Sequence, residues 1–159
     1  MILWIASYPK SGNTWLRAIV QCLLKPNIDN EMLFQEMSNN IRQFPLKMDF
    51  KELSNIIYER RNYNNNYLLK ETIKNWIPVQ RKINKDKNVK IFKTHNVLSK
   101  INLENKDYNF TDLENTIGVL HVVRDPRTLV SSIKNHFYLK TEEESLEMLF
   151  NKNMWSGFG

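Results

Sequence analysis

The sequence predicts an α/β protein in which helices flank a central parallel sheet. Two short apolar runs, residues 2–6 and 117–123, have the length and composition of buried strands, and residues 89–93 alternate as a half-buried strand does. Segments with helical spacing separate these strands, and such alternation favours a parallel sheet in a single domain over residues 1–159. In sheets of this kind ligands bind at the carboxyl ends of the strands. We therefore expect the functional residues just after each strand.

The first strand leads through a loop into an amphipathic helix that ends before Lys25 and Pro26. The lone cysteine, Cys22, lies in this helix and is expected to be packed. A single cysteine permits no internal disulfide, which fits a reducing, cytoplasmic location. The apolar residues of this helix recur at helical spacing and are expected to pack on the sheet: Leu16, Ile19, Val20, Leu23 and Leu24.

The middle of the chain predicts helices with polar connections. Residues 27–48 have weak periodicity and are expected to form a loop with at most one short helix. Asp49 opens a capping box that predicts a helix over residues 50–60. A further helix is predicted over residues 67–85, which Pro78 should kink or restart. Its candidate core residues are Leu68, Leu69, Ile73, Trp76 and Ile77.

Residues 99–110 are polar and are expected to be irregular. The apolar run 117–123 that follows is expected to be the central strand of the sheet, with His121 as a hydrogen-bonded core histidine. Asp125 and Pro126 are typical of the N-cap and first position of a helix. A capping box at residues 141–144 predicts the start of the last helix.

Composition narrows the function classes. The net charge is +6, from 23 Lys and Arg against 17 Asp and Glu, so anionic partners are favoured. No dense block of basic residues appears, and we expect no nucleic-acid partner. No apolar stretch approaches the ~20 residues needed to cross a bilayer, so no membrane span is expected. No Cys/His spacing suggests a metal site, and none is expected.

The loop after the first strand has the composition of an anion-binding turn. Gly12 permits positive φ or close backbone approach, Lys10 adds a charge, and Ser11 and Thr14 add hydroxyl donors. The helix N-terminus behind the loop has unpaired N–H groups and a positive dipole. The loop is not a Walker A sequence, because its lysine precedes the glycine by two residues.

Two further blocks follow the other strands. Lys93 and His95 are two apart in an extended segment and so share one side of it. A base that accepts a proton and a cation near developing charge are what group transfer to a hydroxyl requires. Arg124 follows the third strand, and Ser132 lies eight residues later on the next helix. A guanidinium fork and a hydroxyl suit a phosphate. Alone, each pattern is also typical of structural residues.

Together the three blocks resemble the sulfotransferases that use 3′-phosphoadenosine 5′-phosphosulfate (PAPS). The first block resembles their 5′-phosphosulfate-binding loop, the second their Lys-Thr-His catalytic segment, and the third their 3′-phosphate-binding segment. The resemblance implies a P-loop-NTPase-like three-layer fold, PAPS as donor and a small-molecule or glycan acceptor. It implies His95 as general base, with Lys10 and Lys93 as electrostatic stabilisers. The donor-binding residues implied are Lys10, Ser11, Gly12, Asn13, Thr14, Trp15 (stacked on the adenine), Arg124 and Ser132.

One departure from the family pattern leaves other functions open. Family members usually continue into a glycine-rich, basic C-terminal segment, whereas glycine occurs here only at positions 12, 118, 157 and 159. We therefore expect an incomplete domain with weak or no turnover. The alternatives are a P-loop kinase with Asp125 as its acidic residue, a truncated fold that only binds nucleotide or a protein partner, and a weakly supported nucleic-acid-binding domain. Neither the acceptor nor the oligomeric state has a recognisable sequence pattern.

Overall fold

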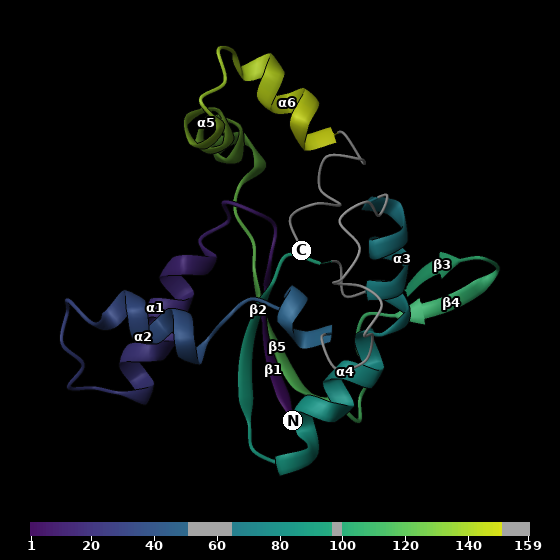
Figure 1. Cartoon of the computed structure of the whole chain (residues 1–159). Helices are drawn as coiled ribbons and strands as arrows, with labels where there is room; N and C mark the ends of the chain where they lie inside the picture. The colour runs from purple at the N-terminus through teal and green to yellow at the C-terminus, as the bar shows by residue number, and fades with distance from the viewer. Residues whose placement is uncertain (51–64, 97–99, 151–159) are drawn as a thin grey trace.

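The computed structural model describes residues 1–50, 65–96 and 100–150. Its central sheet is parallel, in the order β2–β1–β5. The strands are β1 (Ile2–Ser7), β2 (Lys90–Thr94) and β5 (Thr116–Val122). Helices α1 (Asn13–Leu24) and α2 (Leu33–Asn40) lie on one side, and α3 (Asn65–Lys74) and α4 (Trp76–Ile83) on the other (Figure 1). The predicted α/β fold with a flanked central sheet is confirmed, and the arrangement fits a P-loop-like fold.

An aromatic cluster fills the space between the sheet and helix α4. Trp4 of β1 is fully buried at its centre, and its indole N–H donates to Thr116 Oγ1 at 3.0 Å. Its ring lies 5.1 to 6.0 Å from three phenylalanine rings, close enough for favourable tilted contacts. These rings are Phe44, Phe92 and Phe110.

The helix predicted over residues 67–85 is two helices, α3 and α4, followed by the 3₁₀ turn η2 (Asn84–Asp86). The break comes at Asn75, whose side-chain amide donates to the Glu71 carbonyl at 2.9 Å. Pro78 lies in the first turn of α4, where no intrahelical N–H is needed. The predicted restart is thus confirmed, slightly earlier than Pro78.

The predicted core of this segment is only partly right. Ile73 and Trp76 are buried, whereas Leu69 is exposed and Ile77 is half-buried. The side chain of Leu68 lies outside the described part of the chain.

The 3₁₀ turn η1 (Lys47–Phe50) precedes the helix predicted over residues 50–60, most of which lies outside the described ranges. Asp49 accepts bonds from the Leu46 N–H and from Arg42. Helix α2 is the one short helix expected within residues 27–48.

The prediction that residues 117–123 form the central strand is wrong. Strand β1 occupies the centre because it pairs with β2 on one side and β5 on the other. Within the described residues β5 has no second partner strand, so much of it stays accessible, including Ile117 and Val119. For the same reason His121 is exposed and is not a core histidine.

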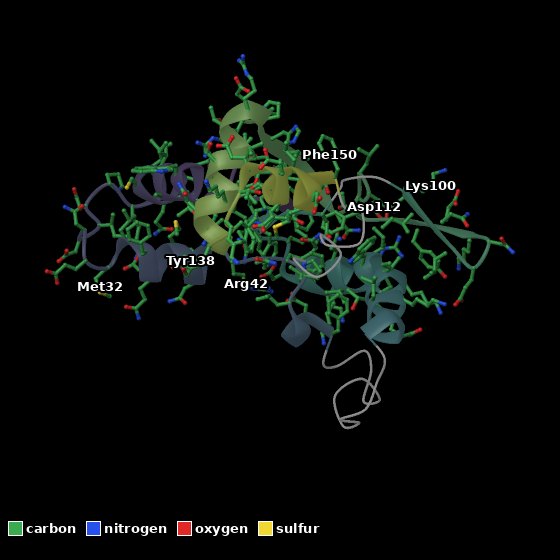
Figure 2. The ribbon with its side chains drawn as sticks, turned by 90° about the horizontal axis from the view of Figure 1, so that it is seen from above. Met32, Arg42, Lys100, Asp112, Tyr138 and Phe150 are labelled. Atoms are coloured by element: carbon green, nitrogen blue, oxygen red, sulfur yellow. The ribbon has the colours of Figure 1, made fainter. Side chains whose placement is uncertain are left out.

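The segment expected to be irregular, residues 99–110, is regular over most of its described part, residues 100–110, so this prediction is wrong. It contains the antiparallel hairpin of β3 (Lys100–Leu103) and β4 (Lys106–Asn109). The two turn residues, Glu104 and Asn105, both have positive φ, as a type I′ turn requires. Glutamate is rare at such a position, so the sequence carried little turn signal. Lys100, at the base of the hairpin, and Met32, in the loop before α2, lie on opposite sides of the molecule (Figure 2).

Helix α1 is rotated relative to its predicted orientation. Its buried residues are polar, Asn13, Arg17 and Gln21, which follow one another at four-residue spacing. Asn13 fixes this rotation, because its amide nitrogen donates to the Ile5 carbonyl at 3.2 Å and to Ser7 Oγ at 3.0 Å. Residues expected to pack are exposed instead, namely Ile19, Leu23, Leu24 and Cys22, while Leu16 and Val20 are half-buried.

Two helices follow β5 and pack on each other through Leu129, Ile133 and Met148. Helix α5 (Pro126–Phe137) begins as predicted, with Asp125 as N-cap accepting from the Arg127 N–H at 2.9 Å. Helix α6 (Glu142–Phe150) also has its predicted cap, in which Thr141 Oγ1 accepts from the Glu144 N–H. Over the described residues, no helix combines the length and apolarity that a membrane crossing requires.

Candidate functional site

A pocket of about 480 Å³ opens at the carboxyl ends of the three sheet strands. This volume lies within the usual range for small-molecule sites. All the predicted site residues except Ser11 line it. Ser11 is buried, and its N–H donates to the Tyr8 carbonyl at 3.2 Å. The lining residues are Pro9, Lys10, Gly12, Asn13, Thr14, Trp15, Lys93, His95, Arg124, Ser132, His136 and Phe137.

The loop between β1 and α1 and the first turn of α1 line this pocket. Lys10 and Gly12 both have positive φ, 66° and 106°. Gly12 is the N-cap of α1, and neither a side-chain cap nor an acidic residue in the first turn competes for the helix N–H groups. An uncapped helix N-terminus favours an anion through its N–H groups and its dipole.

Arg124, which follows β5, is hydrogen-bonded to the loop between β1 and α1. Its Nη1 donates to the Lys10 carbonyl at 3.1 Å, and its Nε donates to Thr128 Oγ1 at 2.9 Å. The first bond supports Lys10 in a conformation that costs free energy for any residue but glycine. The second holds the guanidinium beside α5, the helix that carries Ser132.

Lys93 and His95 lie side by side, as their spacing predicted, with Lys93 Nζ 3.4 Å from His95 Nε2. Residues 42–44 hold the backbone of Lys93 on the side of β2 away from β1. The Lys93 N–H donates to the Arg42 carbonyl, and the Lys93 carbonyl accepts from the Phe44 N–H. His95 Nδ1 lies 2.9 Å from the Ser7 carbonyl, which can only accept. The proton is therefore on Nδ1, and Nε2 of the neutral ring carries the lone pair.

The surroundings of His95 favour its neutral form. Burial lowers the pKa of His95 most, and the charges of Lys93 and Arg17 lower it further, against an opposing effect from the bond to the Ser7 carbonyl. Burial and the Arg17 charge also lower the pKa of Lys93. Of the described residues around the pocket, none is a carboxylate and several are cationic. An anionic ligand is thus favoured here.

Some residues of this region were not identified from the sequence. His136 and Phe137 line the pocket near the end of α5, with their rings edge to face at 4.8 Å between centroids. Ser7 orients His95, and Arg17 lies buried nearby. The spacing of His136 from Ser132, one helical turn, is the only sequence signal that points to it.

Asp125 is engaged as a helix cap and with Arg127, whose Nη2 lies 2.6 Å from its carboxylate. Its location therefore favours a structural role over that of a kinase acidic residue. Over the described ranges there is no group of three or more His, Cys, Asp or Glu placed to hold a metal ion.

The parallel sheet has a first strand that leads through a loop into an uncapped helix beside a cation-rich pocket. This arrangement is that of an α/β protein and fits a P-loop-like fold. The family model described as "Sulfotransferase domain" matches residues 2–158 of the chain. The chain therefore belongs to the sulfotransferase domain family, and the resemblance seen in its three sequence blocks is confirmed. Membership indicates a transferase of sulfuryl groups. No curated protein and no solved structure matches the chain significantly.

Proposed function

We propose that this domain transfers a sulfuryl group from PAPS to a hydroxyl or amine of a small-molecule or glycan acceptor. One observation carries the proposal. His95 lines the pocket that also contains Lys93 and the uncapped N-terminus of α1, with its Nδ1 2.9 Å from the Ser7 carbonyl and its Nε2 3.4 Å from Lys93 Nζ. A neutral base beside a cation-rich anion site is what sulfuryl transfer from a phosphosulfate needs. We retain a cytoplasmic location as part of the proposal, because the sequence contains a single cysteine.

The pocket residues fit the donor by their charge and hydrogen-bonding groups. The loop from Lys10 to Thr14 offers N–H groups, a hydroxyl and a cation for the phosphosulfate. Arg124 and Ser132 line the same pocket and suit the 3′-phosphate. Trp15 is 78% exposed at this pocket, so its indole face is available for stacking on adenine.

The donor, when bound, supplies an activated sulfuryl group on a phosphate leaving group. His95 Nε2 accepts the proton of the acceptor hydroxyl as the acceptor oxygen bonds to sulfur. The bond between sulfur and the 5′-phosphate oxygen breaks in line, and that oxygen keeps the electron pair. Lys10 and Lys93 stabilise the charge that develops there. The products are the sulfated acceptor and adenosine 3′,5′-bisphosphate.

Thermal stabilisation tests the donor site. At 100 times Kd, adenosine 3′,5′-bisphosphate should stabilise the fold by about 2.7 kcal/mol. For a chain of this size that corresponds to a rise in Tm of roughly 5–11 °C. ATP with magnesium should give no comparable rise. The reverse result would support a kinase, and no response to either ligand would support a domain that does not bind nucleotide.

Two variants separate donor binding from chemistry. Lys10→Ala should abolish the response to the bisphosphate, whereas His95→Ala should keep it. In a single-turnover assay with PAPS and a panel of hydroxyl acceptors, His95→Ala should lower the transfer rate by about 10²- to 10⁴-fold. If both variants bind and transfer as the unsubstituted chain does, the assigned roles are wrong.

A further inference from the structure

One wall of the pocket carries three polar side chains with hydrogen-bonding groups that the protein does not use. Arg124 precedes α5, Ser132 and His136 lie on it, and all three line the pocket. Among the described residues, Arg124 Nη2, the Ser132 hydroxyl and the nitrogens of the His136 ring have no hydrogen-bond or ion-pair partner. Polar groups that line a pocket without a protein partner are available to a ligand.

The spacing of these residues places them in one row along α5. Ser132 and His136 are four residues apart, and such residues lie on one side of a helix with their Cβ atoms about 5–6 Å apart. Arg124 joins the row through the 2.9 Å bond from its Nε to the hydroxyl of Thr128, the residue four positions before Ser132. Ser132 therefore lies between the guanidinium and the imidazole.

The charges along this wall favour an anion. His136 lies in the last turn of α5, where the helix dipole favours positive charge. None of the described residues that line the pocket is a carboxylate. Glu142 of α6 accepts from Ser131 at 3.0 Å and is not a lining residue. A guanidinium, a hydroxyl and an imidazole in one row suit a phosphate monoester, which has three terminal acceptor oxygens.

The two imidazoles that line the pocket are held in different ways. His95 follows β2, with its Nδ1 2.9 Å from the Ser7 carbonyl and its Nε2 3.4 Å from Lys93 Nζ. The ring of His136 instead lies edge to face with that of Phe137, on the helix that follows β5. Strands β2 and β5 flank β1, so they are about 10 Å apart, which is two inter-strand spacings. His136 is thus suited to a different part of a ligand from the part that His95 contacts.

We propose that His136 determines specificity for the 3′-phosphate of the donor, to which it donates a hydrogen bond beside Arg124 and Ser132. The inference rests on the proposed function, which supplies the donor, and deepens it. It adds a residue outside the three sequence blocks, and it assigns to that residue part of the discrimination against a nucleotide without a 3′-phosphate.

Calorimetric binding of two nucleotides tests this assignment. Adenosine 3′,5′-bisphosphate and adenosine 5′-monophosphate differ only in the 3′-phosphate, so the ratio of their Kd values reports on contacts to that group. In His136→Ala, the Kd for the bisphosphate should rise about 5- to 50-fold, whereas the Kd for the monophosphate should change less than about twofold. His136→Lys keeps N–H donors and a positive charge at this position and should restore most of the preference for the bisphosphate.

His121→Ala is the matched control, because His121 is exposed on β5 and does not line the pocket. It should leave both Kd values unchanged. Equal weakening of the two nucleotides in His136→Ala would overturn the inference, because it would place the ring against the adenine, the ribose or the 5′-phosphate. An unchanged preference for the bisphosphate in this variant would overturn it as well.

Failure of the proposed function gives a different result. It appears as no binding of either nucleotide to the unsubstituted chain, which would remove both proposals. Failure of this inference alone appears as a preference for the bisphosphate that does not depend on His136.

Discussion

Gly12→Ala measures how far the loop that we propose binds the donor's phosphosulfate depends on one backbone conformation. Gly12 has φ 106° and ψ 14°, in the left-handed region that costs an L-residue about 1–2 kcal/mol. Added bulk is not the problem, because a Cβ at this position would meet Val122 Cγ1 at 3.9 Å, an ordinary contact. The expected loss of stability is therefore about 1–2 kcal/mol, which lowers Tm by roughly 2–8 °C for a chain of this size.

Gly118→Ala is the matched control. Gly118 lies in β5 without positive φ, and a Cβ there would meet Leu3 Cδ1 at 3.4 Å. This variant should stay within about 1 kcal/mol of the unsubstituted chain. Urea denaturation measures both, and adenosine 3′,5′-bisphosphate binding should weaken only in Gly12→Ala, whose loop N–H groups are redirected. Equal stability and equal binding in the two variants would refute the reasoning.

Three further predictions concern neighbouring side chains. Trp15→Ala should leave stability unchanged, because the side chain is exposed, but weaken bisphosphate binding by roughly 5- to 150-fold, measured by calorimetry. Asn13→Ala removes both bonds that fix α1 and should lower the free energy of unfolding by about 1–3 kcal/mol in urea. His95 has a lowered pKa in the folded state, so the unfolded chain binds the proton first and stability declines as pH falls below about 6.5. His95→Gln should flatten that decline in urea titrations at several pH values, and a steeper decline would contradict the assigned direction.

The sequence predicted the strands well because their signals are local. Two short apolar runs and one alternating segment mark β1, β5 and β2 to within a residue. Asp125 and Thr141 likewise cap helices through bonds to residues two or three positions away. The rotation of α1 was mispredicted because apolar spacing assumes that the apolar face turns inward. In α1, two hydrogen bonds from Asn13 to Ile5 and Ser7 of β1 turn a polar face toward the sheet instead.

The residues of the candidate site were named from short motifs, and the pocket brings nearly all of them together. What they bind remains a prediction. Arg17 and Ser7 escaped notice because their importance depends on burial and on contacts across the sheet. His95 Nδ1 meets a carbonyl 88 positions away, and no spacing rule anticipates such a contact. The position of β5 at the edge of the sheet also depends on which strands pair, which one strand's composition cannot reveal.

Ser7 accepts hydrogen bonds from two residues of the candidate site. Its hydroxyl accepts from the Asn13 amide, and its carbonyl accepts from His95 Nδ1. Helix α1 and the His95 imidazole are therefore both hydrogen-bonded to Ser7. A shift of either one would disturb the hydrogen bond that Ser7 makes to the other. Substitutions at Asn13 and His95 should consequently show energies that do not add in a double-mutant cycle. Single substitutions in this pocket will each include part of the same interaction energy, so their summed effects will exceed the effect of the combined substitution.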